Sequence, residues 1–314
     1  MFMKLSILVT FYNQSQYVDF TLDMFLSMHY DFEFEILIGD DGSSDDTVKK
    51  LEGWKKKYPT IISYFVMDRE KGVTYNPIER AALNRVNLLK HAKGEYVSFL
   101  DGDDFFCDKE KFIEQINILE NNPNVVGSAT NCYMYWNDDK KELLDVNEKK
   151  DRLLKAKDYW RYVYYHISTF VFRNVFLNKE LNFNEKCFDD NYITFVFLKY
   201  GDIHYFNKVT SCYRQTENSV WNETDQIDKD IINLMDYQFE LEYNPDFKKE
   251  ILYRHLKEFY YLKRADLDDS RISPKIKARL DSTNVDIYKL IGTKIKCIRF
   301  KMFANRVIRK LKRI

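Results

Sequence analysis

The sequence predicts an α/β fold with a mainly parallel central sheet, followed by a helical C-terminal region. Short apolar, β-branched runs alternate with segments of helical periodicity through the first half of the chain, which is typical of strands joined by crossover helices. Several runs end in clusters of Gly and Asp, which stop strands. Of the 314 residues 45% are hydrophobic, enough for a packed core.

The elements follow from these patterns in order. The apolar runs predict strands over residues 5–10, 34–38, 61–67, 95–100, 125–136 and 203–213. Helical spacing predicts helices from Ser15, from Asp45, and over residues 78–92, 109–120 and 189–200. The highly charged stretch 138–157 is expected to form a loop and an exposed helix, and residues 225–290 to be helical.

Acidic clusters directly follow two of the expected strands. Asp40 and Asp41 come after the second strand, and residues 101–104 (DGDD) follow the fourth. Because the carboxyl ends of parallel strands meet at one edge of the sheet, these carboxylates are expected to converge there. Such oxygen ligands suit Mg²⁺ or Mn²⁺ bound together with a phosphate group. The alternative is that the aspartates only shape turns and cap helices.

The charge distribution and cysteine usage limit the compartment and partners. The formal net charge is zero, but residues 294–314 hold nine Lys/Arg and no Asp/Glu, leaving 40 basic and 49 acidic residues in the rest. The five Cys are scattered, with no C-x-x-C pair, which favours a reducing compartment without structural zinc or disulfides. No apolar run is long enough for a transmembrane helix.

Four motifs in order resemble those of the family 2 glycosyltransferases. They are residues 6–13 (SILVTFYN), 38–45 (IGDDGSSD), 94–104 (GEYVSFLDGDD) and 188–190 (FDD), and residues 213–215 (YRQ) add a weaker match. The resemblance covers roughly residues 4–220. It implies the GT-A nucleotide-sugar-binding fold and an inverting transfer that needs a divalent metal.

The resemblance assigns the donor site residue by residue. Tyr12 matches the aromatic residue that stacks on uracil, and Thr10 lies beside it. Asp41 matches the carboxylate that accepts from the base N3–H, a pairing that selects uracil over cytosine. Asp103 matches the metal-binding acid of the D-x-D motif, with Asp101 as its partner near the ribose or the metal. The implied cofactor is Mn²⁺ or Mg²⁺, which neutralises the departing diphosphate.

The resemblance also implies a catalytic base and shows departures from the family pattern. Asp190 matches the general base that takes the acceptor's proton, and Arg214 is expected to approach the diphosphate. Asp189 stands where the family more often has Glu, and an acidic pair at a helix start is the structural alternative for both. The usual Arg-Asn pair is out of register, because Asn84-Arg85 lies slightly early. The Q-x-x-R-W motif of processive members is absent, which favours transfer of single sugars.

The resulting hypothesis is a metal-dependent inverting glycosyltransferase. It would move one sugar from a UDP-sugar to a hydroxyl of a glycan or lipid-linked acceptor in bacterial surface polysaccharide or glycoconjugate synthesis. The alternatives are a sugar nucleotidyltransferase, although the Gly-rich, Arg-containing first loop is missing, and a non-catalytic carbohydrate-binding protein. A dinucleotide-binding oxidoreductase is disfavoured because no G-x-G-x-x-G follows the first strand. The expected domains are residues 1–222 (GT-A), 223–292 (helical) and 293–314 (basic tail).

The basic tail is expected to form an interfacial helix on an anionic membrane surface. At ~100° per residue, its apolar residues lie on one face, namely Phe300, Phe303, Ala304, Val307, Leu311 and Ile314. Its basic residues lie on the other, namely Arg299, Lys301, Arg306, Arg309, Lys310, Lys312 and Arg313. The protein is therefore predicted to be cytoplasmic and peripheral at the inner face of the cell membrane, without nucleic acid as a partner. Docking of the apolar stripe on the protein itself is the alternative.

Overall fold

The computed structural model describes residues 3–145, 150–161, 165–216 and 224–292. The chain divides into two compact units: Met1–Ala156 with Val163–Glu217, and Lys157–Tyr162 with Asn218–Ile314. The boundary expected at residues 222–223 and the basic tail, residues 293–314, lie outside the described residues.

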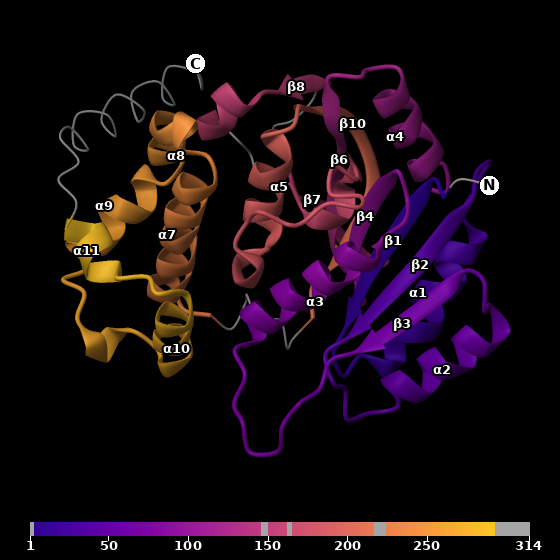
Figure 1. The fold of residues 1–314 in the computed structure, drawn as a ribbon, viewed down its shortest axis with the longest axis horizontal. Coiled ribbons are helices and arrows are strands. Elements are labelled where there is room, and N and C mark those ends of the chain that lie inside the picture. The colour runs from indigo at the N-terminus through magenta and orange to yellow at the C-terminus, as the bar shows by residue number, and fades with distance from the viewer. Residues whose placement is uncertain (1–2, 146–149, 162–164, 217–223, 293–314) are drawn as a thin grey trace. The chain divides into compact units, whose positions relative to one another are not determined.

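The first unit is built on one mixed sheet of ten strands (Figure 1). Its main strand order is β3-β2-β1-β4-β9-β6-β10-β5, with β7 paired to β6 and β8 to β10. The strands are β1 (Leu5–Phe11), β2 (Phe34–Asp40), β3 (Ile62–Val66), β4 (Tyr96–Asp101), β5 (Phe105–Phe106), β6 (Val125–Asn137), β7 (Lys140–Leu143), β8 (Arg152–Leu154), β9 (Val171–Arg173) and β10 (Asp202–Arg214).

Helices cover both faces of this sheet, as crossover connections require. They are α1 (Ser15–Ser27), α2 (Thr47–Lys57), α3 (Pro77–His91), α4 (Lys111–Glu120) and α5 (Asp190–Leu198). One core cluster joins alternate residues of β1 to apolar side chains of α1, α2 and α4. The helices α3 and α5 lie on the other face of the sheet (Figure 1), where α3 packs on β1 and β2.

The predicted fold class is confirmed, with two corrections. The pairs β1–β2, β1–β4, β2–β3 and β6–β10 are parallel, whereas β9 runs antiparallel to both β4 and β6. The prediction of an exposed helix within residues 138–157 was wrong for the part of that stretch that the structure describes. It contains β7 and β8 instead, because an Asn137 side chain that accepts from two backbone N–H groups turns the chain into a hairpin with β6.

The second unit is helical, as residues 225–290 were expected to be. Its helices are α7 (Gln226–Tyr243), α8 (Lys248–Arg254), α9 (Leu256–Arg264), α10 (Pro274–Thr283) and α11 (Ile287–Gly292). Asp225 caps α7 by accepting from the backbone N–H groups of Ile227 and Asp228. A buried pair, His255 Nε2 and Glu240 Oε2 at 2.9 Å, joins α8–α9 to α7. Within the described residues, no helix combines the length and apolarity that crossing a bilayer requires.

Candidate active site

The acidic clusters converge at the carboxyl edge of β1, β2 and β4. Register places Thr10 of β1 beside Gly39 of β2 and Asp101 of β4. The Thr10 hydroxyl donates to Asp101 Oδ1 at 2.9 Å, and the Gly102 N–H donates to the Thr10 carbonyl at 2.8 Å. The residues that follow the three strands, including Tyr12, are therefore neighbours at one edge of the sheet.

The loops after β1 and β2 are locked together, and this separates the roles of Asp40 and Asp41. The Asn13 N–H donates to Ser43 Oγ at 2.8 Å, and the Ser44 N–H donates to Asn13 Oδ1 at 2.8 Å. Asp40 accepts from the Ser43 N–H at 2.8 Å and serves the turn, as the structural alternative proposed. The next residue, Asp41, instead directs its carboxylate toward two arginines.

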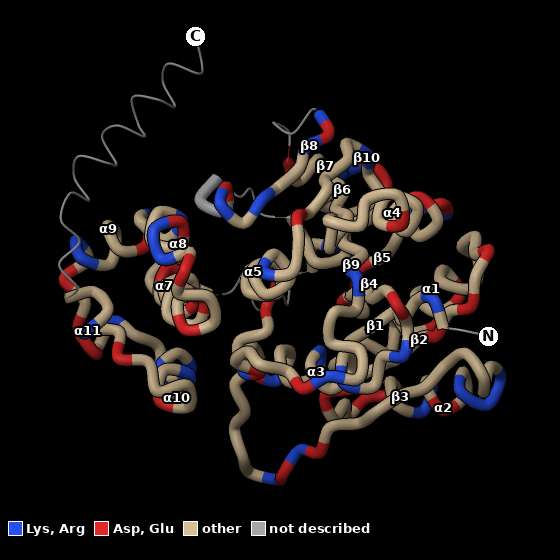
Figure 2. Tube along the Cα trace, turned by 45° about the horizontal axis from the view of Figure 1, so that its top comes forward, with Lys and Arg blue, Asp and Glu red and all other residues tan. Residues whose placement is uncertain are grey.

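Asp41 is a buried carboxylate neutralised by Arg69 and Arg80. Arg69 Nη2 lies 2.5 Å from Asp41 Oδ2, and Arg80 Nε lies 2.5 Å from Oδ1. Arg80 belongs to α3, whereas Arg69 belongs to the β3–α3 loop, which carries alternating acidic and basic segments in Figure 2. The Arg69 guanidinium also lies over the Tyr12 ring, 4.2 Å from its centroid. Tyr12 is 44% exposed, so its ring is accessible at the surface.

A third arginine, Arg85 of α3, joins the two carboxylates that were expected to serve the donor and the acceptor. Its Nη2 lies 2.8 Å from both oxygens of Asp101 and 3.6 Å from Asp190 Oδ1. Burial by itself would raise the pKa of Asp101, but the charges of Arg85 and His166, together with hydrogen bonds from Arg85 and Thr10, outweigh burial and lower this pKa. Arg85 thus holds Asp101 ionised and lies beside the expected base.

Asp103 and Asp104 are the acids of the cluster whose pKa values are raised. Burial, and then the charge of Asp101, raise the pKa of Asp103 to about 6. Burial also raises the pKa of Asp104, whose Oδ1 accepts from the Arg214 N–H at 2.8 Å. A cation near Asp103 would relieve this repulsion, so the donor set fits a divalent metal. Among the described residues no group of three His, Cys, Asp or Glu side chains is arranged as a complete metal cage.

Arg214 lies beside this acidic loop at the end of β10. Its Nε donates to the Asp103 carbonyl at 2.7 Å. Its guanidinium is surrounded by aromatic rings, with centroids 4.9 Å away for Tyr17, 5.0 Å for Phe105 and 5.4 Å for Tyr135. Cation–π contacts of this kind hold the guanidinium in place. Arg214 therefore braces the loop of Asp103 and presents a positive charge next to it.

The adjacent Asp189 and Asp190 have different surroundings at the start of α5. Asp189 is the N-cap, and its Oδ1 accepts from the Tyr192 N–H at 3.1 Å. Asp190 is the first residue of the helix, with its carboxylate 3.6 Å from Arg85 and 18% exposed. Both residues lie at the helix start, as the structural alternative proposed, but Asp189 caps the helix whereas Asp190 lies beside Arg85.

The three arginines were absent from, or marginal in, the sequence-based site. The sequence did contain a sign of two of these arginines, because polar residues lie on an otherwise apolar face of α3. Arg80, Asn84 and Arg85 share the buried side of this helix with Ala82 and Val86. Buried arginines need counter-ions, which directs attention to the nearby carboxylates. Arg69 leaves no such signal, because it lies in a polar loop.

Arg85→Met is expected to destabilise the fold by about 3 kcal/mol at pH 7.5, because it leaves Asp101 partly buried without its partner. Beside Arg85 the pKa of Asp101 is lowered, so the wild type keeps this contribution at every pH above the unfolded value of about 3.9 and loses it only below. In the variant, burial without Arg85 should raise the pKa of Asp101, so its carboxyl takes up a proton at a higher pH and the destabilisation shrinks toward pH 4, with Arg85→Lys intermediate. Urea unfolding of both variants between pH 8 and 4 measures this, and a pH-independent loss would contradict the Arg85–Asp101 pairing.

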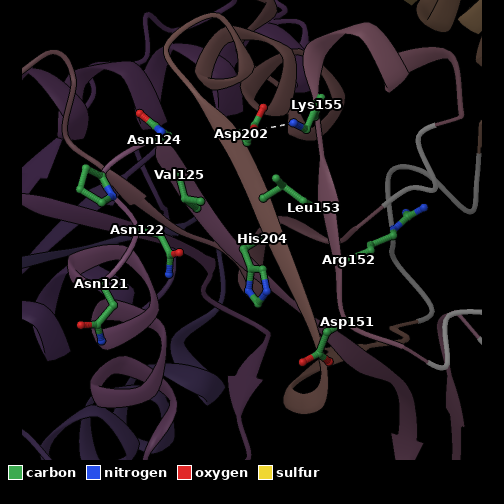
Figure 3. A pocket seen from close by; sticks show the side chains of 11 residues that line it. Asn121, Asn122, Asn124, Val125, Asp151, Arg152, Leu153, Lys155, Asp202 and His204 are labelled. Atoms are coloured by element: carbon green, nitrogen blue, oxygen red, sulfur yellow. Dashed lines mark ion pairs between the residues drawn. The ribbon is translucent and has the colours of Figure 1, made fainter.

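A separate hollow of about 610 Å³ lies at the opposite edge of the sheet. It is at the amino ends of β6 and β10, where Figure 3 shows Val125, Asp202 and His204 among its lining residues. Lys155 Nζ lies 3.8 Å from Asp202 Oδ2 across it. None of the expected donor-site residues lines this hollow, so the candidate active site is at the carboxyl edge.

Several proteins of known sequence are similar to part of this chain. The chain is 35% identical over 104 residues to a poly(ribitol-phosphate) beta-glucosyltransferase of Bacillus spizizenii, a match covering 33% of this chain and 15% of the relative. It is 28% identical over 134 residues to the uncharacterized glycosyltransferase YfnE of Bacillus subtilis, covering 43% of this chain and 30% of the relative. Matches to the uncharacterized mycobacterial proteins span only 32% of those relatives.

Solved structures share the fold at low identity. Staphylococcus aureus TarS 1–349 in complex with UDP-GlcNAc has a TM-score of 0.62 and 18% identity, covering 88% of this chain and 78% of that one. The mannosyltransferase PcManGT of Pyrobaculum calidifontis, in complex with GDP-Man and Mn²⁺, has a TM-score of 0.58 and 16% identity, covering 90% and 80%. The fold is therefore of the GT-A type.

The family assignment follows from more than half of the chain. The sequence profile of Glycosyl transferase family 2 matches residues 6–182, which include β1, β2, β4 and the acidic clusters at their ends. With this match and its GT-A fold, the chain belongs to glycosyl transferase family 2.

Proposed function

We propose that the protein is an inverting, metal-dependent glycosyltransferase that moves one sugar from a UDP-sugar to a hydroxyl of a glycan or lipid-linked acceptor. The observation that carries the proposal is the Arg85 bridge. It unites an acid of the D-x-D motif, Asp101, with Asp190 at the start of α5, within one site. A donor-binding acid and a base for the acceptor are the two groups that such a transfer needs side by side.

The nucleotide would bind at Tyr12 and Asp41. An exposed aromatic ring next to a buried carboxylate suits a base that stacks and donates one N–H, as uracil does. Cytosine lacks that N–H at the same position, so Asp41 would discriminate against CDP-sugars. The complex of TarS with UDP-GlcNAc supports a uridine nucleotide as the donor. Because PcManGT is seen in complex with GDP-Man, GDP-sugars are the alternative donors to test.

The diphosphate would lie at Asp103. A divalent cation bound there would neutralise charge on the departing UDP, and Mg²⁺ or Mn²⁺ commonly takes one or two carboxylates plus phosphate oxygens. Asp103 is assigned as the ligand because both oxygens of Asp101 already accept from Arg85 and Asp104 accepts from the Arg214 N–H, whereas a cation would relieve the repulsion between Asp103 and Asp101. Arg214 supports the loop from behind by holding the Asp103 carbonyl.

Asp190 would accept the proton from the acceptor hydroxyl. As the acceptor oxygen forms its bond to the anomeric carbon, the bond to the diphosphate breaks on the opposite face, and UDP leaves with that electron pair. One displacement inverts the anomeric centre. The positive charge of Arg85 helps to lower the pKa of Asp101 and lies 3.6 Å from the Asp190 carboxylate, beside the proposed base.

A panel of nucleotide sugars tests the proposal directly. We expect slow, metal-stimulated hydrolysis of UDP-sugars, with at least tenfold preference over CDP- and GDP-sugars, because a lost buried hydrogen bond costs about 1–3 kcal/mol. Conversion of a UDP-sugar and added pyrophosphate to sugar-1-phosphate and UTP would identify a nucleotidyltransferase instead. Binding of glycans without turnover of any donor would identify a carbohydrate-binding protein. A polyribitol-phosphate acceptor is the first to try, given the Bacillus spizizenii relative.

We further propose that residues 293–314 hold the enzyme at the cytoplasmic face of an anionic membrane. Each Lys/Arg near such a surface contributes ~1 kcal/mol, and this segment is rich in them. Flotation with anionic and neutral liposomes should show salt-sensitive binding to the anionic ones only. A chain that ends at Gly292 should lose this binding and keep activity on a soluble acceptor. If that shortened chain aggregates, the apolar stripe serves as core and the membrane proposal fails.

A further inference from the structure

Arg69 occupies the position in which the nucleotide base is proposed to bind. Its guanidinium lies over the Tyr12 ring at 4.2 Å from the centroid. Its Nη2 donates to Asp41 Oδ2 and its Nε donates to the Asp41 carbonyl, both at 2.5 Å. A planar group thus covers the aromatic face and delivers N–H donors to the carboxylate beside it.

These are the two interactions that uracil would make at the same place. A guanidinium and a uracil ring are both flat, both stack on an aromatic face, and both present N–H groups at an edge. We propose that Arg69 is a built-in surrogate for the base, which fills the nucleotide site until the donor displaces it. This inference rests on the proposed function, because it takes Tyr12 and Asp41 as the base-binding pair.

The second arginine on Asp41, Arg80, is more deeply buried than Arg69 and belongs to a helix, so it should stay in place when Arg69 is displaced. Arg80 is 10% exposed, donates from Nε to Asp41 Oδ1, and donates from Nη2 to the Asp68 carbonyl at 3.1 Å. Arg69 is 25% exposed and reaches Asp41 from a loop. When Arg69 leaves, Arg80 stays as the counter-ion on Asp41 Oδ1, and Asp41 Oδ2 becomes available to accept the base N–H.

The surroundings of Arg69 leave space for its loop to move away from Asp41. The β3–α3 loop projects from the edge of the sheet (Figure 1), and its Gly72 has φ +84° with nothing within 4 Å of a Cβ placed there. Val73, next in the loop, is 48% exposed. A Cβ placed on Gly42 would lie 2.9 Å from Arg69 Cγ. The aliphatic part of the Arg69 side chain can therefore lie here only because residue 42 is a glycine. The guanidinium is held by its contacts with Tyr12, Tyr75 and Asp41, not by enclosure.

Displacement of Arg69 by the base and direct contact of Arg69 with the bound nucleotide predict opposite changes in UDP affinity when Arg69 is removed. If Arg69 competes with the base, its removal raises the fraction of molecules whose site is open, and the apparent affinity for UDP rises, by roughly three- to tenfold. If Arg69 instead contacts the bound nucleotide, its removal weakens binding. Arg80→Ala is the matched control, since loss of the permanent counter-ion should weaken UDP binding.

Calorimetric titration of UDP into the full-length protein, Arg69→Ala and Arg80→Ala tests this without catalysis. We expect tighter binding to Arg69→Ala and weaker binding to Arg80→Ala. Guanidinium chloride at non-denaturing concentration should then compete with UDP in Arg69→Ala, because it can refill the vacated place, while NaCl of equal ionic strength should not. Wild-type binding should respond equally to the two salts.

The outcomes separate the two proposals. UDP binding that weakens in Arg69→Ala, or stays unchanged there with no competition from guanidinium, overturns the surrogate role and leaves the nucleotide site standing. Failure of all three proteins to bind UDP overturns the nucleotide site, and the inference with it.

Discussion

Asp190→Asn is expected to lower kcat by ~10²–10⁴-fold, with little change in the donor KM. Asn is nearly isosteric with Asp but cannot take the proton of the acceptor hydroxyl. The carboxylate of Asp190 lies 3.6 Å from Arg85 and outside the proposed base-binding pair, so donor binding should survive. Steady-state kinetics with a UDP-sugar and a soluble acceptor, together with UDP titration, measure both parts.

The adjacent residue supplies a matched control. Asp189→Asn removes the same charge one position away, and Asn caps helices about as well as Asp, so the bond to the Tyr192 N–H should persist. We therefore expect Asp189→Asn to keep most of its activity and its melting temperature. An inactive Asp189→Asn beside an active Asp190→Asn would move the base to Asp189.

Asp103→Asn is expected to abolish metal-stimulated transfer and, at the same time, to stabilise the fold. Burial and Asp101 raise the pKa of Asp103 to about 6, above the ~3.9 of an unfolded Asp. The folded state therefore binds more protons between these two values, and stability falls as the pH rises through them. Above pH 6 the full penalty is present, so removing the charge should gain about 1–2 kcal/mol at pH 7.5 after allowance for partial exposure.

Thermal melts and metal titrations separate these two effects. The melting temperature of Asp103→Asn should exceed that of the wild type at pH 7.5 and match it near pH 4, where both are uncharged. Added Mn²⁺ with UDP should raise the melting temperature of the wild type only. Wild-type activity at limiting metal should decline below about pH 6, as the Asp103 carboxyl gains its proton. Full activity of Asp103→Asn in Mn²⁺, or of the wild type in excess EDTA, would remove Asp103 from the metal site.

Prediction from sequence succeeded where the signal is local. Apolar runs identified β1, β2, β4, β6 and β10, because a buried strand needs a short apolar segment ended by strand-breaking residues. It failed at β7 and β8, whose charged residues, such as those of 140–143, are exposed and pair at the edge of the sheet. Neither strand carries the hydrophobic period that a sequence pattern can detect.

The sequence by itself determined the α/β class and the alternation of the strands β1 to β4 with the helices α1 to α3. It also determined that acidic clusters follow two neighbouring strands, since parallel pairing then brings Asp41 and residues 101–104 to one edge. Only the tertiary structure decided which charges meet there. Arg80 and Arg85 reach Asp41 and Asp101 because α3 packs across β1 and β2, and that docking depends on side chains from the whole sheet face. The same packing distinguished Asp40, which serves a turn, from Asp41, and Asp189, which caps α5, from Asp190. Adjacent identical residues carry the same local pattern, so only the surrounding charges and hydrogen-bond partners tell them apart.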